Sequence, residues 1–341
     1  MQVTLKDISR ETGFSITTVS RALGGYSDVN EHTRQYILIT AKQMGYQPNS
    51  IARQLRNQRT NTIGLIIPEN EHTFSDDFFS QLMMGVGRGA SSLSYDLLIS
   101  AQMSDDEEMD AYHRIGGGNR VDGIVVARTR QNDPRIAYLK ELDLPFVVSG
   151  RLSPDKISDF PYMDADSRAG LHMAVNHLAM LGHQHIGLIL PPEDMAYTAY
   201  RFSGYCEGLS DANIAYRDNY VVTSDLQRSG GYHRAEELMR QFPELTAIIA
   251  CNDHMALGAM KAVQERGLVV GQDLSIIGFD DIPSAEHANP PLTTVRQPIF
   301  EIGIRLAEML IQIVEDRPPA TLQVLLQPTL VIRESTGHCP G

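Results

Sequence analysis

Two groups of polar residues in this sequence have types and spacings that suit binding chemistry. The first lies in GFSITTVSRALGG, residues 13–25, where Ser, Thr and Arg alternate with apolar positions at helical spacing. A helix with short hydrogen-bonding groups outside and apolar residues inside fits the major groove of DNA. Ile16, Thr17 and Arg21 are predicted to point outward. The alternative is an ordinary surface helix that Ser15 caps.

The second group consists of Arg201, Asn252 and Asp280. Asn252 ends the apolar run TAIIACN and Asp280 ends LSIIGFDD, so both would lie where parallel strands present their carboxyl ends to a ligand. Arginine offers a rigid fork of donors, asparagine donates and accepts, and aspartate accepts from adjacent hydroxyls, which suits a polyhydroxylated ligand. The alternatives are a structural ion pair between Arg201 and Asp280, and capping of the following helix by Asn252.

Three short helices are predicted around the first group. A capping box at Thr4 predicts a helix over about 5–12, and Gly13 supplies a sharp turn into the second helix. A third helix begins near Asn30 and ends at Gly45. The tight turn between the first two helices is typical of a helix-turn-helix.

The rest of the chain alternates short apolar runs with amphipathic segments, which predicts parallel sheets covered on both faces. The run of strands exceeds one comfortable sheet, so we expect two doubly wound subdomains that meet near 161–163 with a cleft between them. The predicted strands are TIGLIIP at 62, DLLISA at 96, VDGIVVA at 121, LPFVVSG at 144, HIGLILP at 185, NYVVTS at 219, TAIIACN at 246 and LSIIGFDD at 274.

Charge and composition narrow the function. The chain carries a net charge of −13, yet residues 1–60 hold 8 Lys and Arg against 4 Asp and Glu. A basic head on an acidic body is expected where only the head meets phosphate. Three cysteines without CxxC spacing support neither a disulfide framework nor a zinc site. With no basic-then-apolar leader and no long apolar run, we expect a cytoplasmic protein that neither is secreted nor spans a membrane. We also expect no metal and no cofactor.

Several ordered motifs resemble those of the LacI/GalR family of transcription regulators. VTLKDISRETGFSITTVSRALGG, followed by GYQPNSIARQLR and TIGLIIP, resembles the start of such a protein. LGHQHIGLI, YRFSGYCEGL, CNDHMALGAMKAV, LSIIGFDDIP and NPPLTTVRQP resemble the family's ligand-sensing core. The resemblance implies an α/β protein with a three-helix head, a hinge helix and two doubly wound parallel-sheet subdomains of periplasmic-binding-protein type.

The implied domain organisation follows the same order along the chain. We expect a helix-turn-helix DNA-binding domain over 1–47, a hinge helix and linker over 48–60, and an effector-binding core over 61–341. Within the core, the N-subdomain would comprise about 61–162 and 292–322, and the C-subdomain about 163–291 and 323–335.

The segment PNSIARQLRNQRTN is too short for a helix that is stable alone in water. In the family this hinge helix enters the minor groove, and Leu55 matches the leucine that wedges between base pairs there; Arg56 could add a contact. A plain polar linker is the alternative. The residues expected to contact DNA are Thr4, Ser15, Ile16, Thr17, Thr18, Ser20, Arg21, Asn30, Asn49, Ala52, Leu55 and Arg56.

The resemblance also extends the predicted effector site. Gln297 and Asp164 match binding positions of the family, and Phe74 could offer a ring face to a sugar. Structural roles remain open for Phe74 and Asp164. The residues expected to bind the effector are Phe74, Asp164, Arg201, Asn252, Asp280 and Gln297. The stretch FVVSGR and the Phe74 loop resemble regulators of α-glucoside or α-galactoside use.

The sequence therefore predicts a transcription regulator, a repressor of carbohydrate-utilisation genes whose affinity for its operator depends on a mono- or oligosaccharide in the cleft. A palindromic operator requires a homodimer, and the C-terminal VLLQPTLVIRESTGHCPG is predicted to form a strand and a polar tail rather than a tetramerising helix. The alternatives are a solute-binding protein, which needs a leader, and a sugar-processing enzyme, which needs a nucleophile beside a base.

Overall fold

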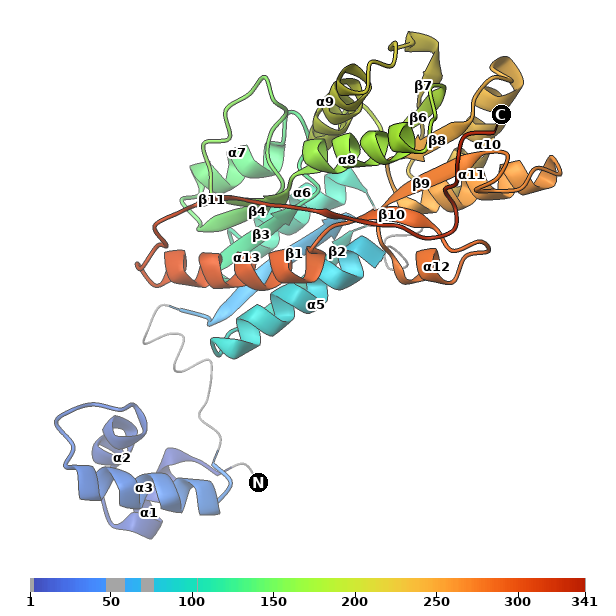
Figure 1. The fold of residues 1–341 in the computed structure, drawn as a ribbon. Helices are drawn as coiled ribbons and strands as arrows, with labels where there is room; N and C mark the ends of the chain where they lie inside the picture. The colour runs from blue at the N-terminus through green and yellow to red at the C-terminus, as the bar shows by residue number, and fades with distance from the viewer. Residues whose placement is uncertain (1–2, 47–58, 69–76, 103, 341) are drawn as a thin grey trace. The chain divides into compact units, whose positions relative to one another are not determined.

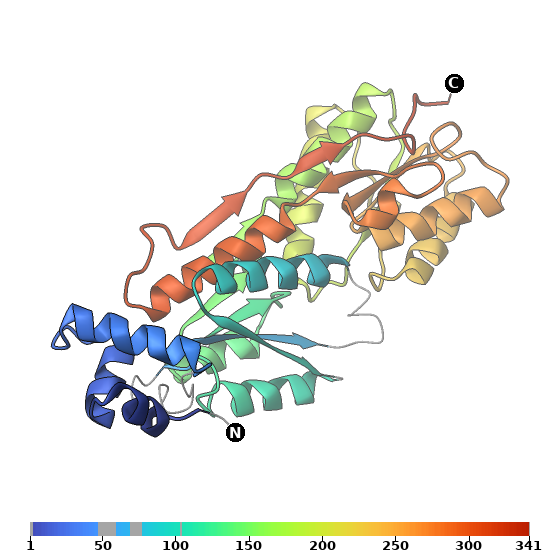
Figure 2. The same cartoon turned by 90° about the horizontal axis from the view of Figure 1, so that it is seen from below.

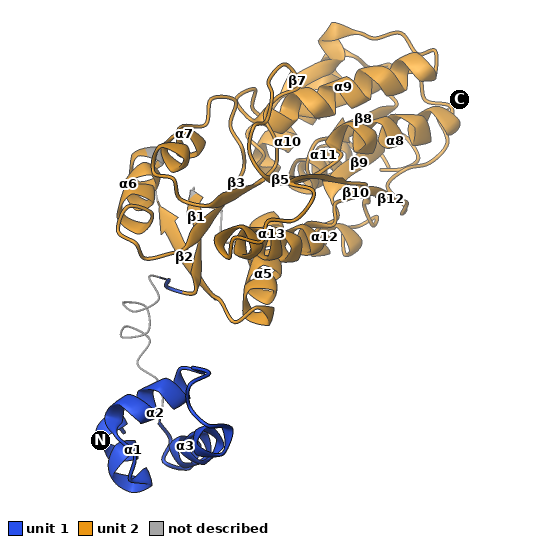
Figure 3. Ribbon diagram, turned by 90° about the vertical axis from the view of Figure 1, so that its left-hand side faces the viewer, with its two compact units in different colours: residues 1–60 blue, residues 61–341 orange. Residues whose placement is uncertain are grey.

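The computed structural model describes residues 3–46, 59–68, 77–102 and 104–340. The chain divides into two compact units, Met1–Thr60 and Asn61–Gly341 (Figure 3). Because residues 47–58 are not among those described, most of the predicted hinge segment 48–60 lies outside the described residues. The predicted site residues outside them are Asn49, Ala52, Leu55, Arg56 and Phe74.

The first unit contains three helices, α1 (Leu5–Thr12), α2 (Ile16–Leu23) and α3 (Glu31–Gln43). One residue of each helix, Ile8, Val19 and Ile37, is wholly buried in a shared apolar core. Gly13 has a φ of 77°, a left-handed conformation that glycine adopts easily and that turns the chain sharply between α1 and α2. The predicted helix-turn-helix is confirmed.

The second unit is built on two six-stranded sheets (Figure 1). The first contains, in order of neighbours, β11 (Gln323–Leu326), β5 (Tyr162–Ala165), β4 (Phe146–Ser149), β3 (Gly123–Ala127), β1 (Thr62–Pro68) and β2 (Asp96–Gln102). The second contains β12 (Thr329–Val331), β10 (Thr293–Arg296), β9 (Ser275–Asp280), β8 (Ala247–Ala250), β6 (Ile186–Leu190) and β7 (Val221–Thr223). Neighbouring strands are parallel apart from β12, which is antiparallel to β10.

Helices cover both faces of each sheet, because the central strands are apolar on both sides. On the first sheet, α5 (Asp77–Ser92) packs against α13 (Ile299–Val314) on one face, while α6 (Asp105–Ile115) and α7 (Pro134–Glu141) share the apolar cluster of the other. A Cβ atom at Gly85 would collide with the carbonyl oxygen of Phe300, so α5 and α13 approach at a glycine.

The second sheet is covered by two helix pairs in the same manner. The pairs are α8 (Ser167–Met180) with α9 (Ala196–Asp211), and α10 (Arg228–Gln241) with α11 (Asp253–Glu265). The short elements Asp218–Tyr220, a 3₁₀ turn, and α12 (Pro283–Glu286) complete the fold. In the part of the chain that the structure describes, no helix has the length and apolar character needed to cross a membrane.

The chain passes between the two subdomains later than predicted. Both β5 and β11 belong to the first sheet, whereas β10 belongs to the second. The crossings therefore follow Ala165, Arg296 and Leu326 rather than the predicted positions near 162, 291 and 322. The predicted single C-terminal strand is also wrong: β11 and β12 lie one after the other and join different sheets (Figure 2).

The eight apolar runs that were predicted as strands are all present; β5 and β10 were not predicted, and β11 and β12 lie where a single C-terminal strand was expected. These four have three or four residues each and lie toward one edge of their sheets. In β11 and β12 the side chains are exposed or only partly buried. Short strands of this kind do not form the continuous apolar runs that mark a central parallel strand.

Candidate functional site

The outer face of α2 presents the side chains that were predicted to contact DNA. Ile16 is 43% exposed, and Thr17 and Arg21 are also exposed. Together with Leu5, Ser20 and Tyr26, these residues line a shallow open depression of the first unit. The inner residues Val19 and Ala22 are buried. The helix therefore has the predicted division between an apolar inner face and a polar outer face.

Several of the predicted DNA contacts also cap helices. The Ser15 hydroxyl accepts a hydrogen bond from the backbone N–H of Thr18 at 3.1 Å and lies 2.8 Å from the Thr18 hydroxyl. The Asn30 side chain accepts from the N–H of His32 at 2.9 Å. The sequence offered capping by Ser15 as an alternative to a DNA-binding helix. The structure shows that Ser15 caps α2 and that α2 is also the second helix of the helix-turn-helix.

Thr4 pairs with Asp7 at the start of α1. The backbone N–H and the hydroxyl of Thr4 donate to the Asp7 carboxylate at 2.9 and 2.6 Å. These hydrogen bonds lower the pKa of Asp7. The predicted capping box is confirmed, and it fixes the helix end at which Thr4 lies.

Arg21 already has an acidic partner in this structure. Its Nη2 lies 2.5 Å from the Asp28 carboxylate, and its guanidinium carbon lies 5.2 Å from the centre of the Tyr26 ring. Both members of the ion pair are about half exposed. Since an exposed pair is worth little free energy, Arg21 can exchange Asp28 for a phosphate or a base edge.

The second candidate site is a cleft within the second unit. Five predicted effector-binding residues line it, although they come from different strand ends and helices. They are Asp164, Arg201, Asn252, Asp280 and Gln297. The space within the cleft, open solvent included, is about 830 Å³. Because its walls follow the carboxyl ends of strands in both sheets, the predicted position of the cleft is confirmed.

Arg201 projects from α9 and is only 5% exposed. Its guanidinium lies between two rings, 4.5 Å from the centre of Tyr197 and 4.0 Å from that of Phe279, and its Nη1 donates to the carbonyl of Cys251. Its Nε is buried without a hydrogen-bond partner among the described residues. Buried donors are nearly always paired, so this donor is an exception among the described residues and remains able to bond to an acceptor.

Asn252 is held rigidly at the cleft wall. Its side-chain oxygen accepts from the N–H of Met255 at 2.8 Å and caps α11, while its amide nitrogen donates to the Leu226 carbonyl at 2.9 Å. The capping role that the sequence offered as an alternative is therefore present. Each amide atom retains further bonding capacity for a ligand.

Asp280 ends β9 with a φ of 116°, a backbone conformation that residues other than glycine rarely adopt. Its carboxylate accepts a hydrogen bond from Nε2 of Gln297 at 2.6 Å. Next to it, Asp253 is fully buried and accepts from Thr294 and from the N–H of Ile282. Burial and the neighbouring Asp280 raise the pKa of Asp253 well above its usual value. Strain of this kind persists where surrounding contacts enforce it, commonly at binding sites.

Asp164 lies on the opposite wall and pairs with a residue that was not predicted. Nε of Arg151 donates to its carboxylate at 3.0 Å, and the Arg151 guanidinium lies 3.8 Å from the centre of the Tyr200 ring. Burial raises the pKa of Asp164, and Arg151 opposes part of that rise. Asp164 thus keeps a fixed position in the cleft through its partner.

Further cleft-lining residues escaped the sequence analysis although a signal for them existed. Arg128 and Thr129 follow the strand VDGIVVA, and Arg151 follows FVVSG. The strand-end rule that selected Asn252 and Asp280 selects these residues as well. Tyr197 and His254, which also line the cleft, lie on helices and carry no comparable signal.

The cleft is suited to hydrogen bonding rather than to covalent catalysis. Its arginines, carboxylates and amides offer donors and acceptors from several directions, beside the rings of Phe78 and Tyr197. The thiol next to Arg201, that of Cys251, is wholly buried, and burial raises its pKa to about 12. A thiol with so high a pKa is not an activated nucleophile at neutral pH.

Comparison with known proteins is consistent with both sites. A model described as bacterial regulatory proteins, lacI family, matches residues 4–49, and one described as a periplasmic binding protein-like domain matches residues 175–336. The HTH-type transcriptional regulator AglR of Rhizobium meliloti is 33% identical over 343 residues, covering 100% of this chain and 96% of AglR. The chain belongs to the LacI family. It is a DNA-binding transcription regulator and not an enzyme.

Two solved structures of LacI-family proteins are similar over nearly the whole chain. The complex of the transcriptional regulator CelR with cellobiose is 29% identical with a TM-score of 0.77, covering 98% of this chain and 100% of CelR. The lac repressor dimer bound to operator and the anti-inducer ONPF is 26% identical with a TM-score of 0.83, covering 99% and 100%. The predicted family and fold class are confirmed.

Proposed function

We propose that this LacI-family regulator is a cytoplasmic repressor of carbohydrate-utilisation genes that binds a palindromic operator as a homodimer. A mono- or oligosaccharide in the cleft controls its affinity for the operator. The buried Nε of Arg201, for which the described part of the chain supplies no acceptor, carries the proposal for the cleft. Asp280 and Asn252 would accept from and donate to neighbouring hydroxyls of the same sugar, and the CelR relative is known in complex with cellobiose.

Thermal unfolding in the presence of sugars tests the identity of the effector. A ligand that binds only the native state raises the Tm in proportion to the logarithm of its concentration. The panel consists of maltose for α-glucosides, melibiose for α-galactosides and cellobiose for β-glucosides, with sorbitol as a non-cyclic control. We expect one disaccharide to raise the Tm and sorbitol not to do so. A Tm that neither these disaccharides nor their constituent monosaccharides, glucose and galactose, shift would contradict the proposal.

On the DNA side, we propose that the outer face of α2 reads each half-site. Ile16 and Thr17 would contact bases at the leading end of the helix, and Arg21 would contact a base or a phosphate. Thr4, Ser15 and Asn30 at the helix ends, and Thr18 and Ser20 within α2, would contact the phosphate backbone. Fluorescence anisotropy with a duplex selected from random sequences should give an affinity that falls steeply with salt. Sedimentation should show a dimer; a stable tetramer would contradict the proposed assembly.

Leu55 belongs to the same proposal and supplies a separate test. If this side chain wedges into the central base step, Leu55→Ala should weaken operator binding and reduce the bend of the DNA. The sugar-dependent rise in Tm should remain that of the wild type, because Leu55 would contact only DNA. Gel mobility of circularly permuted operator fragments measures the bend. An unchanged bend would favour the alternative that residues 48–60 form a plain linker.

A further inference from the structure

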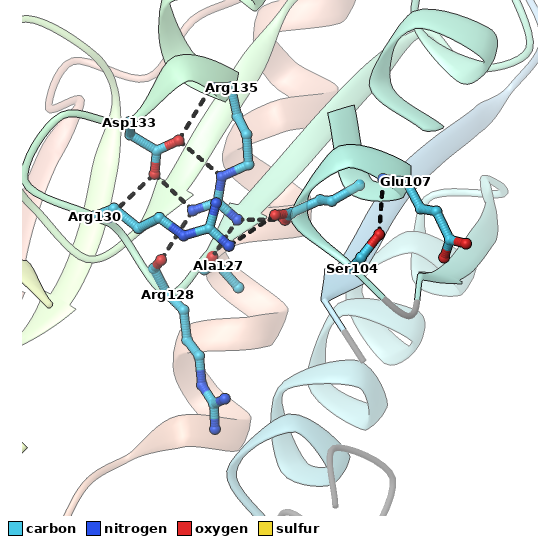
Figure 4. Close-up of polar contacts among 8 residues, drawn as sticks. Ser104, Glu107, Ala127, Arg128, Arg130, Asp133 and Arg135 are labelled. Atoms are coloured by element: carbon cyan, nitrogen blue, oxygen red, sulfur yellow. Dashed lines mark hydrogen bonds and ion pairs between the residues drawn. The ribbon is translucent and has the colours of Figure 1, made fainter. Parts of the chain in front are cut away.

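A buried cluster of charged residues lies in the first subdomain (Figure 4). Arg135 of α7 and Glu108 of α6 are wholly buried, Asp133 is 8% exposed, and Arg130 adds a second guanidinium at the margin. Arg135 donates to both oxygens of Asp133 at 2.8 and 2.6 Å and to Glu108 at 2.8 Å. Arg130 donates to the other oxygen of Glu108 at 2.8 Å.

The same arginine binds the main chain at the end of β3. Nη1 of Arg135 donates to the Ala127 carbonyl at 3.1 Å, and Nη2 donates to the Arg128 carbonyl at 2.9 Å. Its five N–H donors are therefore all used. Asp133, at the other end of the loop 128–133, also caps α7 by accepting from the N–H of Arg135 at 3.1 Å. The Arg135 side chain therefore binds both ends of this loop, the Arg128 carbonyl at its start and the Asp133 carboxylate at its end.

The loop held in this way joins the second subdomain. The N–H of Gln131 donates to the Asp194 carbonyl at 3.0 Å, and the N–H of Ala196 donates to the Thr129 carbonyl at 3.1 Å, which makes an isolated antiparallel bridge. The side chain of Gln131 also donates to the carbonyl of Glu193 at 2.8 Å. Main-chain hydrogen bonds thus join the loop that follows β3 in the first sheet to the loop that follows β6 in the second sheet.

Both sides of this bridge continue into the wall of the cleft. On one side, Arg128 and Thr129 line the cleft. On the other, Ala196 begins α9, whose residues Tyr197 and Arg201 also line it. A displacement of the bridge would move donors on both walls of the cleft.

We propose that Arg135 is a positioning residue for effector binding: it fixes the loop 128–133 so that its bridge to residues 193–196 sets the separation of the two cleft walls. Its importance for the effector rests on the proposed function of the cleft. The positioning itself does not, and it can be measured without an effector. An arginine suits this position because its planar guanidinium donates to two carboxylates and two carbonyls at once, whereas the single ammonium group of a lysine has too few donors to do so.

Hydrogen exchange in the full-length protein tests the proposal with Arg135→Lys, which keeps the charge and removes the fork. The amides of Gln131 and Ala196, whose acceptors lie across the bridge, should exchange about tenfold faster or more. The amide of Ile124 donates to Pro145, and that of Cys251 donates to Ile189. Neither bond crosses between the subdomains, so both amides should keep their wild-type rates. This difference separates positioning from a general loss of stability, which would speed all four amides.

Arg114→Lys is the matched control, because Arg114 is exposed on the neighbouring helix α6; it should change none of the four rates. If Arg135→Lys does not fold, Arg130→Gln replaces it, since the Arg130 side chain is 21% exposed and its loss removes the bond to Glu108 while Arg135 stays in place. It should speed Gln131 and Ala196 selectively but less. Unchanged or uniformly faster exchange in the folded variant overturns the proposal. A failure of every sugar to bind, with selective exchange observed, would instead overturn only the proposed effector.

Discussion

The outer face of α2 and the cleft both present polar side chains, but they hold them by contacts of different range. On α2 and its neighbours, Ser15 bonds to Thr18 and Arg21 pairs with Asp28, all within one short stretch. In the cleft, Arg201 reaches a carbonyl 50 residues away and Asn252 one 26 residues away. The proposed DNA-reading surface is therefore local and exposed, whereas the proposed effector site is assembled by the fold and largely buried.

This difference has an energetic consequence. Exposed pairs such as Arg21 with Asp28 contribute little free energy and exchange partners readily, which suits a surface that must adapt to DNA. Buried donors such as those of Arg201 lose much more free energy when a partner is missing. Substitutions in the cleft should accordingly have larger and more specific effects than substitutions of surface charges in the helical unit.

The largest expected effect is that of Arg201→Ala. Loss of a buried, charged donor should weaken sugar binding by about 1.5–3 kcal/mol, measured by titration calorimetry. Operator affinity without sugar should stay near that of the wild type. Arg168→Ala is the control, because Arg168 is exposed and pairs with Glu207 on the surface. Sugar affinity equal to that of the wild type would remove Arg201 from the site and would break the comparison.

Asp280→Ala should have the next largest effect, about 1–3 kcal/mol of sugar affinity, since it removes an acceptor and leaves a ligand hydroxyl or Gln297 unpaired. The response of operator binding to sugar should fade in anisotropy titrations while the basal affinity persists. If the variant instead unfolds the core, or abolishes DNA binding with normal sugar affinity, Asp280 has a structural role and its place in the effector site is wrong.

Arg21→Ala should weaken operator binding by about 1–3 kcal/mol for each contact it makes. The effect should appear in anisotropy as a lower affinity, with a shallower salt dependence if the contact is to phosphate. Arg10→Ala, at the 83% exposed Arg10 of α1, provides the control. Selection of binding sites by an Ile16 and Thr17 double variant should give a different consensus, and an unchanged consensus would contradict base reading by this end of α2.

The pH dependence of stability should also distinguish the two units. His177 and His183 are buried in the second unit, His183 lies 2.9 Å from the Thr246 hydroxyl, and burial lowers the pKa of both imidazoles. In the unfolded chain each imidazole takes up a proton near its usual pKa of about 6.5, whereas in the folded chain it stays neutral to a lower pH. The contribution of the two neutral histidines to the free energy of unfolding is therefore complete above about pH 6.5 and is lost as the pH falls. For each histidine, the free energy of unfolding should change by at most about 1.4 kcal/mol per pH unit.

A variant isolates this contribution from the carboxylates. Chemical denaturation should show His183→Gln to be less stable than the wild type at neutral pH, and the difference in free energy of unfolding should shrink as the pH falls below about 6.5. His32→Gln, at an exposed position of α3, should show no such trend. A difference that is constant with pH would show that His183 contributes only packing.

The smallest expected effect is that of Asp28→Asn. Removal of the exposed partner of Arg21 should raise operator affinity by less than about 1 kcal/mol, because a surface ion pair is worth about that much or less. The gain should diminish at high salt, where such pairs are screened. A large loss of affinity in anisotropy would show that Asp28 itself orders the reading surface, which would bring the two regions closer in character.

The local parts of the molecule were predictable from the sequence. The Thr4 capping box, the Gly13 turn, the cap at Ser15 and the inner face of α2 depend on neighbours within a few residues, and the structure contains all of them. Six of the eight recognised strands, β1, β3, β4, β6, β8 and β9, lie inside their sheets, where burial on both faces favours continuous apolar runs. The strand-end positions of Asn252 and Asp280 followed directly from those runs.

The sequence by itself thus determined the helix-turn-helix, the class of the fold and the residues at the ends of the apolar strands. Only the tertiary structure decided the course of the short strands β5, β10, β11 and β12, because their pairing depends on neighbours far along the chain. It alone brought Arg151 to Asp164 and sandwiched Arg201 between Tyr197 and Phe279. The buried contacts of Arg135 likewise depend on segments that meet only after folding, since no periodic pattern in a single sequence records which buried charges will be partners.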